Sequence, residues 1–223
     1  MKYATARRLL PGWLRRYAYA FEALIEDSVT DLAARLPAGA RVLDAGAGEG
    51  QYSAHFQSQR YTGVDLGIGD AGWNYAGLDA VADLCALPFA GGTFDAALNI
   101  VTLEHLREPG RALRETARVL RPGGILLLVA PLDWEVHQAP HDYFRYTRHG
   151  LEYLLAQAGL EVKEMTAAGG LFRLLSRRLL NAAQLAPWLL PFFGPLALIL
   201  PLLDGLDRRR DFTLGYRCIA HKA

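Results

Sequence analysis

The sequence predicts an α/β fold in which a doubly wound, mostly parallel sheet is covered by helices on both faces. Short apolar runs alternate along the chain with segments of helical period, as strands and crossover helices do. A helix is expected from Gln51 to about Gln59, directly behind a glycine-rich turn. Strand, glycine turn and helix form the opening unit of a nucleotide-binding fold, whose ligand lies beyond the strand's C-terminal end. The turn follows the strand Arg41–Leu43 and contains Asp44, Gly46, Gly48 and Gly50.

Length and composition fit one globular domain with an appendage. Hydrophobic residues make up 52% of the 223 residues, which is enough for a large core. A net charge of +1 excludes bulk attraction to nucleic acid, so no nucleic-acid partner is expected. Cys85 and Cys218 lack metal-ligand spacing, which predicts buried thiols in a reducing compartment. The N-terminus lacks the apolar core of a signal peptide, so a cytoplasmic location is expected.

A helix is predicted before the first strand. Apolar residues recur at helical spacing from Leu14 to Leu36, and Pro37 and Gly39 end the pattern. Residues 1–40 are therefore expected to form a helical cap that covers the sheet. The lead-in to this helix is basic and aromatic, and it could instead contact anionic lipid headgroups. It contains Arg7, Arg8, Trp13, Arg15, Arg16, Tyr17 and Tyr19.

The second strand is predicted over Tyr61–Asp65 and ends in an acid. Asp65 lies 15 residues after Gly50, which is about the separation expected of the acid that binds a ribose. A carboxylate there can accept hydrogen bonds from the two neighbouring ribose hydroxyls of a nucleotide, one on each oxygen. The alternative is an acid that merely faces solvent. A third strand is predicted over Leu78–Leu84. The connection Leu66–Gly77 is rich in glycine and lacks a helical period, so the usual crossover helix should be reduced or lost.

The second half of the chain continues the alternation of strands and helices. Pro109 should open a helix that runs to about Leu120, and Thr147 should cap another that Gly159 closes. About forty residues separate the sixth predicted strand from the seventh and last one. This gap predicts an insertion over residues 171–210 between the two strands. The remaining strands are predicted over Thr93–Asn99, Ile125–Ala130, Leu160–Thr166 and Thr213–His221.

The glycine spacing separates two classes of nucleotide-binding protein. A dinucleotide fold would need a glycine at position 51, which is Gln51, so a nicotinamide reductase is disfavoured. The spacing Asp-x-Gly-x-Gly-x-Gly, from Asp44 to Gly50, resembles motif I of the class I S-adenosylmethionine (SAM)-dependent methyltransferases. The segments FDAALNIVTLEHL and VLRPGGILLLVAP extend the resemblance to the methyltransferase type 11 family, which includes ubiquinone and menaquinone methyltransferases. The resemblance covers roughly residues 40–165. It implies a Rossmann-like, seven-stranded sheet whose last strand is antiparallel.

The resemblance also implies how SAM, the expected co-substrate, is bound. The glycine loop would line the methionine side, Asp65 would hold the ribose, and Asn99 would lie under the methionyl group. Asp83 and Leu84 would meet the adenine ring. No metal is expected, because the sequence contains no zinc-ligand cluster. The candidate cofactor-binding residues are Asp44, Gly46, Gly48, Asp65, Leu66, Asp83, Leu84 and Asn99.

The loop after the fifth strand should form the substrate side, because it emerges at the sheet's C-terminal edge. His141, beside Asp142, is the first candidate for a general base, and His105 after the fourth strand is the second. Tyr143 is a further catalytic candidate, and Arg145 could hold an acidic or phosphate group on the acceptor. In the alternative interpretation the histidines only attach the loop to the sheet.

The insertion is unusually apolar, with no charged residue from Leu179 to Leu203. That length suits a membrane-spanning helix. Four prolines interrupt it, however, and a single span would place the last strand across the bilayer from its sheet. Two interpretations remain: short helices that form a lid over the site, or a hairpin that dips into one leaflet. In the second, Arg177, Arg178 and Arg208–Arg210 would lie at the headgroups.

The sequence therefore predicts a SAM-dependent methyltransferase that acts at a hydroxyl of a small or lipid-like acceptor. Residues 41–170 would form the core, completed by a final strand within residues 211–223. The protein would be cytoplasmic and peripheral on the inner face of a membrane, with an anionic surface as its partner. The alternative is a non-catalytic, membrane-docked subunit that binds SAM without transferring its methyl group.

Overall fold

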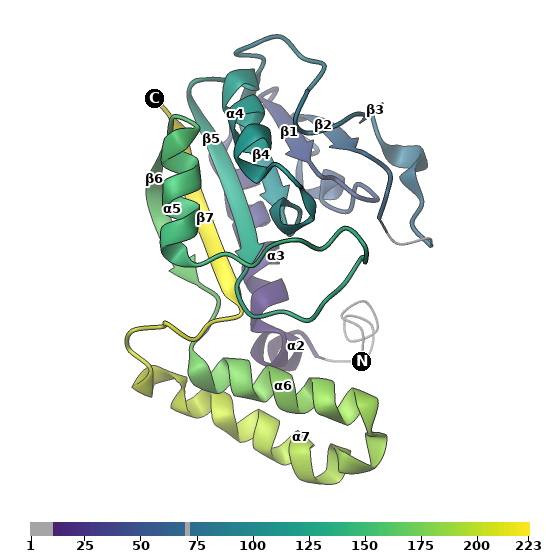
Figure 1. The fold of residues 1–223 in the computed structure, drawn as a ribbon, viewed down its shortest axis with the longest axis vertical. Helices are drawn as coiled ribbons and strands as arrows, with labels where there is room; N and C mark the ends of the chain where they lie inside the picture. Colours follow the sequence, from purple (N-terminus) through teal and green to yellow (C-terminus); the bar gives the residue numbers. More distant parts are fainter. Residues whose placement is uncertain (1–10, 70–71) are drawn as a thin grey trace.

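The computed structural model describes residues 11–69 and 72–223, and seven strands in these residues form one sheet (Figure 1). They are β1 (Arg41–Ala45), β2 (Arg60–Asp65), β3 (Ala80–Val81), β4 (Phe94–Ile100), β5 (Leu120–Pro131), β6 (Leu160–Ala167) and β7 (Gly215–Lys222). Their order is β3-β2-β1-β4-β5-β7-β6. The first five pair in parallel, whereas β7 is antiparallel to both β5 and β6. The predicted fold class, including the antiparallel last strand, is confirmed.

Helices cover both faces of the sheet (Figure 1). The helix predicted over residues 14–36 is present but broken at Tyr19, whose φ of −118° and ψ of 59° are not helical. Tyr19 is buried there, with the guanidinium of Arg177 5.1 Å from the centroid of its ring. The helices are α2 (Gly12–Ala18), α3 (Ala20–Arg35), α4 (Pro109–Val119), α5 (Arg148–Gln157), α6 (Leu171–Leu185) and α7 (Leu190–Ile199).

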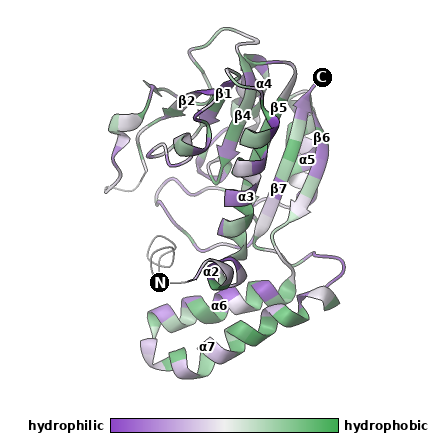
Figure 2. Ribbon diagram, turned by 180° about the vertical axis from the view of Figure 1, so that it is seen from behind, coloured by the Kyte–Doolittle hydropathy of each residue, from purple (hydrophilic) through white to green (hydrophobic). Residues whose placement is uncertain are grey.

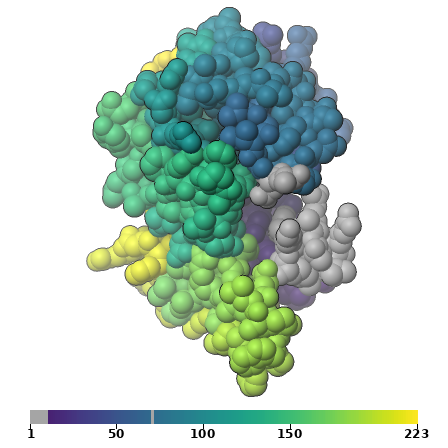
Figure 3. All heavy atoms as spheres, turned by 45° about the vertical axis from the view of Figure 1, so that its right-hand side comes forward, coloured from purple at the N-terminus to yellow at the C-terminus, as the bar shows by residue number. Residues whose placement is uncertain are grey.

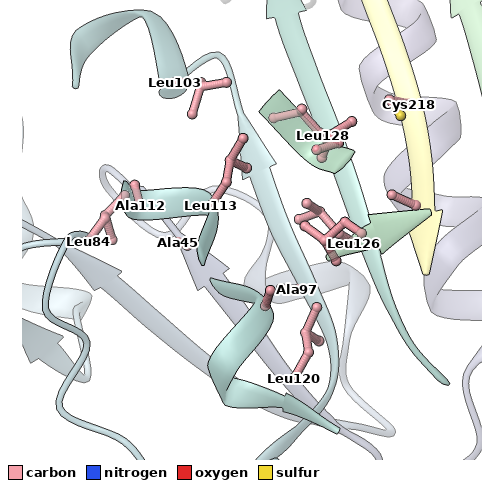
Figure 4. Packing of buried hydrophobic residues seen from close by; sticks show 14 of the residues in the cluster. Ala45, Leu84, Ala97, Leu103, Ala112, Leu113, Leu120, Leu126, Leu128 and Cys218 are labelled. Atoms are coloured by element: carbon pink, nitrogen blue, oxygen red, sulfur yellow. The ribbon is translucent and has the colours of Figure 1, made fainter. Parts of the chain in front are cut away.

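Successive residues of the central strands face two separate hydrophobic cores. Leu126 and Leu128 of β5 point toward α4 and α5, and Figure 4 shows them in this core with Cys218 of β7. Leu127 and Val129 point to the other face, where α3 packs. Because both faces are buried, the strands are continuous apolar runs, and this is why they could be located in the sequence. Cys218 is fully buried, as predicted.

Two local predictions are wrong. The helix expected from Gln51 to Gln59 is absent, and the segment forms turns with one 3₁₀ turn, η1 (Ser53–His55). Only Phe56 is fully buried in this segment, and one apolar anchor does not offset the cost of nucleating a helix. The third strand, β3, is shorter than predicted. The crossover helix expected to be lost is absent from residues 66–69 and 72–77, which contain only η2 (Tyr75–Gly77).

The insertion forms α6 and α7, which lie side by side at one end of the molecule (Figures 1 and 2). The Ser176 hydroxyl of α6 donates a hydrogen bond to the backbone carbonyl of Ala197 in α7 at 2.6 Å. The Tyr17 hydroxyl of α2 donates one to the backbone carbonyl of Leu198, also in α7, at 2.6 Å. Three prolines stand at the starts of η4 (Pro187–Leu189), α7 and η5 (Leu200–Leu206), and Pro195 lies inside α7. Three of these prolines thus stand near the points where the helix begins or changes type, while η4, α7 and η5 follow one another without a gap.

Hydrophobic residues predominate along α7 (Figure 2), and several of their large side chains are exposed, including those of Leu190 and Phe192. Among the described residues, Pro187–Leu206 alone is long and apolar enough to cross a membrane by length and composition, and only 17% of its most apolar window is buried. Arg177 and Arg178, which the hairpin interpretation places at lipid headgroups, form ion pairs with carboxylates of this chain. Arg177 pairs with Glu22 at 2.8 Å, and Arg178 pairs with Glu135 at 2.9 Å. The lead-in residues Arg7 and Arg8 lie outside the described residues.

Candidate active site

A cavity of about 700 Å³ opens at the C-terminal ends of β1, β2 and β4. The loops after these strands form its floor and one wall, and the segment after β5 forms the facing wall. Phe21 and Ile25 of α3 contribute an apolar side. Figure 3 shows this face of the molecule, where the segment after β5 stands beside the segments after β1 and β2. The topology of a parallel sheet places a ligand site at this edge.

The glycine loop after β1 approaches its neighbours too closely for side chains. Gly46 has a φ of +98°, and a Cβ there would overlap the Thr102 side chain. Gly48 has a φ of +55°, and a Cβ would come 3.0 Å from the Trp73 ring. Both positions therefore need glycine. The backbone of this loop faces the cavity directly, because no side chain intervenes.

Asp65, at the end of β2, fixes the two loops that follow β1 and β2. Its Oδ2 accepts a hydrogen bond from the Gly48 amide at 2.9 Å, and its Oδ1 accepts one from the Gly67 amide at 2.8 Å. Each carboxylate oxygen has a further lone pair, and the side chain is only partly buried. Asp65 can therefore hold two neighbouring hydroxyls of a ligand while it positions the loops.

The structure places six of the eight predicted cofactor residues at the cavity wall and two beneath it. Asp44 is fully buried, and its Oδ2 accepts a hydrogen bond from the Tyr61 hydroxyl at 2.6 Å. Asn99 is also buried, and its amide donates to the carbonyl of Ala45 at 3.0 Å. Burial raises the pKa of Asp44 to about 7. These two residues support the glycine loop from below. The six at the wall are Gly46, Gly48, Asp65, Leu66, Asp83 and Leu84.

Two further residues near the predicted adenine side line the cavity. Trp73 packs over the glycine loop from the segment where the crossover helix is missing. The aromatic cluster in that glycine-rich segment was the available sequence signal. Cys85 lies in the turn after β3 and lines the cavity, and it is only partly buried, so the prediction of a buried thiol is wrong for this residue.

On the predicted substrate side, His141, His105 and Tyr143 line the cavity, but Asp142 does not. The His141 ring does not pair with the carboxylate of Asp142, its neighbour in the sequence. The Nδ1 of His141 lies 3.1 Å from the Tyr143 hydroxyl, whereas the Asp142 carboxylate accepts from Arg145 at 2.6 and 2.8 Å. Arg145 also donates to backbone carbonyls, so it is a loop anchor and not a group free to hold an acceptor.

Sequence reasoning missed Glu104, which lies in the segment that carries the family resemblance. Its side chain is fully buried beside two imidazoles, those of His105 and His137. Burial raises the pKa of Glu104 to about 8 and lowers the pKa of His105 below its ordinary value. Its backbone carbonyl accepts a hydrogen bond from the amide of Tyr143 at 2.9 Å, which attaches the substrate-side loop to the end of β4.

The insertion does not cover the cavity in this structure. Among the described residues, none between 171 and 210 lines it. Arg178 contacts Asp133 and Glu135 in the segment after β5, and Arg177 contacts Glu22 of α3. The apolar face of α7 is therefore directed away from the site.

Part of the chain is similar to a known protein family. Residues 43–128 match the family model described as "Methyltransferase domain". An uncharacterized methyltransferase of Mycobacterium sp. (strain KMS) is 36% identical over 99 residues, which are 41% of this chain and 39% of that protein. A fatty-acid O-methyltransferase of Mycolicibacterium smegmatis is 38% identical over 99 residues, or 40% of this chain and 36% of that protein. The chain thus spans less than half the length of these relatives.

Among solved structures, the [4+2]-cyclase SpnF is 25% identical, with a TM-score of 0.60 over 88% of this chain and 80% of that protein. The fold is thus shared by proteins whose named reactions differ. The residues that face the cavity must therefore decide the chemistry.

Proposed function

We propose that the chain is a class I SAM-dependent methyltransferase, with SAM as its co-substrate, and that it transfers the methyl group to a hydroxyl of a small or lipid-like acceptor. The observation that carries this proposal is the arrangement of the cavity. The glycine loop and Asp65 stand on one side, and His141 stands on the other. Its volume of about 700 Å³ can hold a nucleoside-sized co-substrate beside part of an acceptor.

The residues of this chain would contribute orientation, exclusion of water and one proton transfer. SAM supplies a methyl group on a positively charged sulfur, which is an excellent leaving group. The Asp65 carboxylate and the loop amides would hold the nucleoside end, so that the methyl carbon faces the substrate-side wall. His141 would remove the acceptor's hydroxyl proton as the new O–C bond forms and the C–S bond breaks.

The walls of the cavity favour an acceptor with an apolar portion. Phe21 and Ile25 of α3 line the side next to Trp134, whose ring lies 5.3 Å from that of Phe21. The relative from M. smegmatis is named for a fatty-acid acceptor, whose apolar chain is of the kind that these walls favour. The apolar chain of such an acceptor would move from water to this apolar side of the cavity, and the acceptor's hydroxyl would lie beside His141.

Binding of SAM is tested by calorimetry with the demethylated product, S-adenosylhomocysteine. We expect Asp65→Ala to weaken binding by about 10–100-fold, because charge-assisted hydrogen bonds contribute about 1.5–3 kcal/mol. The matched control is Asp79→Ala. Asp79 also accepts a backbone hydrogen bond, from Gly63 at 2.8 Å, but it does not line the cavity. Equal affinities for the two variants would remove Asp65 from the site, and tighter binding of NADH than of SAM would overturn the proposal.

Methyl transfer is tested separately, with SAM labelled on the methyl group and a panel of fatty acids, quinols and polyprenyl alcohols. The proposed reaction is supported if the wild type forms labelled product and His141→Ala does not. Tight SAM binding without product, together with lipid extracts that gain no label, would favour the non-catalytic SAM-binding subunit.

We further propose that the insertion docks the protein on the cytoplasmic face of an anionic membrane. Trp188 and Phe192 are 72% and 69% exposed, and they belong to the apolar stretch of which little is buried. Such a patch facing water would favour association. Arg208 and Arg209 are exposed at its edge, and no ion pair involves them among the described residues. The free thiols of Cys85 and Cys218 agree with a reducing compartment.

Flotation with phosphatidylglycerol vesicles tests this docking. The wild-type protein should float with the vesicles, and Trp188→Ser/Phe192→Ser should not. Tyr153→Ser on α5 is the control, because Tyr153 is 65% exposed on another face. High salt should weaken binding only modestly, because two arginines carry the electrostatic part and the apolar part is not screened. A monomeric wild-type protein that stays out of the lipid fraction would refute the proposal.

A further inference from the structure

Three side-chain atoms converge at the substrate-side wall of the cavity. The Oε1 of Glu104 lies 3.8 Å from the Nε2 of His105 and 3.8 Å from the Nε2 of His137. One ligand atom from each of the three residues lies within 4.8 Å of the others. Glu104 and His105 come from the turn after β4, called η3 (Leu103–His105), and His137 comes from the loop after β5. The fold thus joins two segments that the sequence keeps apart.

None of these atoms has a hydrogen-bond partner among the described residues. Both carboxylate oxygens of Glu104 and the Nε2 atoms of His105 and His137 are buried without one. At 3.8 Å the carboxylate and the imidazoles are too far apart to bond to one another directly. Burying four unsatisfied polar atoms at one point is costly. A group that accepts lone pairs from all three residues would remove this cost.

The other nitrogen of each imidazole is already bound to backbone. The Nδ1 of His105 lies 2.6 Å from the carbonyl oxygen of His141, and the Nδ1 of His137 lies 3.0 Å from that of Glu135. A carbonyl only accepts, so each Nδ1 must carry the proton and each Nε2 must present a bare lone pair. Histidines that bind metals are oriented in the same way, by a hydrogen bond from the other ring nitrogen.

We propose that Glu104, His105 and His137 bind a divalent first-row transition-metal ion, with Zn²⁺ as the reference ion. Two imidazoles and one carboxylate form a common donor set for such ions and leave a coordination position open. Ligand atoms about 2.0–2.1 Å from a tetrahedral ion lie about 3.3 Å apart. The two carboxylate–imidazole separations of 3.8 Å must therefore close by about 0.5 Å, and any pair as far apart as 4.8 Å must close by about 1.5 Å when an ion binds. His105 and His137 line the cavity, so the open position would face the acceptor.

The role of the ion rests on the methyl transfer proposed above. An acceptor oxygen bound to the ion would have a lowered hydroxyl pKa, and His141 would then remove its proton more easily. The electron pair left on the acceptor oxygen would form the O–C bond as the C–S bond of SAM breaks. Metal binding itself does not require this reaction, so the two can be tested apart.

The test is calorimetry of the full chain, treated with a chelator and then titrated with Zn²⁺, with the visible absorption of Co²⁺ as a second measurement. We expect one ion per chain for the wild type. Glu104→Gln and His137→Ala should each bind at least about tenfold more weakly and lose the Co²⁺ absorption. His149→Ala is the control, because His149 is 89% exposed on α5, away from the site. S-adenosylhomocysteine affinity is measured on every variant to report an intact fold.

Two outcomes would overturn the inference. One is wild-type protein that binds no stoichiometric Zn²⁺, which would assign the space between the three side chains to water. The other is Zn²⁺ affinity that is equal in the wild type, Glu104→Gln and His137→Ala. Loss of SAM binding with retained Zn²⁺ binding would instead refute the proposed function and leave the metal site standing.

Discussion

Replacing Asp44 with asparagine should flatten the dependence of folding stability on pH. Asp44 is completely buried at the end of β1, where its Oδ2 accepts from the Tyr61 hydroxyl at 2.6 Å and its Oδ1 has no partner among the described residues. Burial raises the pKa of this carboxyl from its ordinary value of 3.8 to about 7, although the Tyr61 hydrogen bond opposes the rise. Asparagine has the same shape and can still accept from Tyr61, but it does not titrate.

The sign of the effect follows from the two pKa values. The folded protein holds the Asp44 proton more tightly than the unfolded chain, so this contribution to stability is fully present below pH 3.8. It is lost progressively as the pH rises from 3.8 to about 7, because over this range the carboxyl ionises in the unfolded chain while the folded protein keeps the proton. A difference of about three pKa units corresponds to about 4 kcal/mol, at about 1.4 kcal/mol for each unit.

Urea unfolding between pH 4.5 and 8.5 measures this contribution. The free energy of unfolding of Asp44→Asn, relative to the wild type, should rise by up to about 4 kcal/mol across this range. Tyr61→Phe provides a second arm, because it removes the opposing hydrogen bond and should move the loss to higher pH. Parallel curves for the wild type and Asp44→Asn would refute the assignment of a neutral buried carboxyl to Asp44.

Three further predictions concern the site. His141→Ala should lower turnover by about 10²–10⁴-fold and leave SAM affinity unchanged in calorimetry; full turnover would make His141 structural. Gly46→Ala should lower the melting temperature and SAM affinity, and Thr102→Gly should restore part of both by removing the overlap, so no recovery would contradict the steric argument. Arg145→Gln should cost about 1–3 kcal/mol in urea unfolding, because it leaves the carboxylate of Asp142 without its cation; an unchanged midpoint would show the pair to be dispensable.

The sequence by itself determined the sheet and located the glycine loop and the acid that line one wall of the cavity. Strands buried on both faces must be continuous apolar runs, so their positions could be located from hydrophobicity alone. The glycine loop and Asp65 were also predictable, because a turn that requires positive φ is a local property and the acid lies at a set distance along the chain. The prolines of the insertion likewise identified its short helices, since each removes a backbone donor where it stands.

Tertiary structure decided which polar groups meet. The sequence placed Asp142 beside His141, but the fold turned its carboxylate to Arg145, and it brought His137 to Glu104 from another strand's loop. It also directed the insertion away from the cavity, by packing α6 on the N-terminal helices through Arg177 and Glu22. Such pairings depend on how separate elements pack, and spacing along the chain carries no record of them. The physical reason is that burial removes water as a partner, so each polar group must take whatever partner the packed structure brings to it.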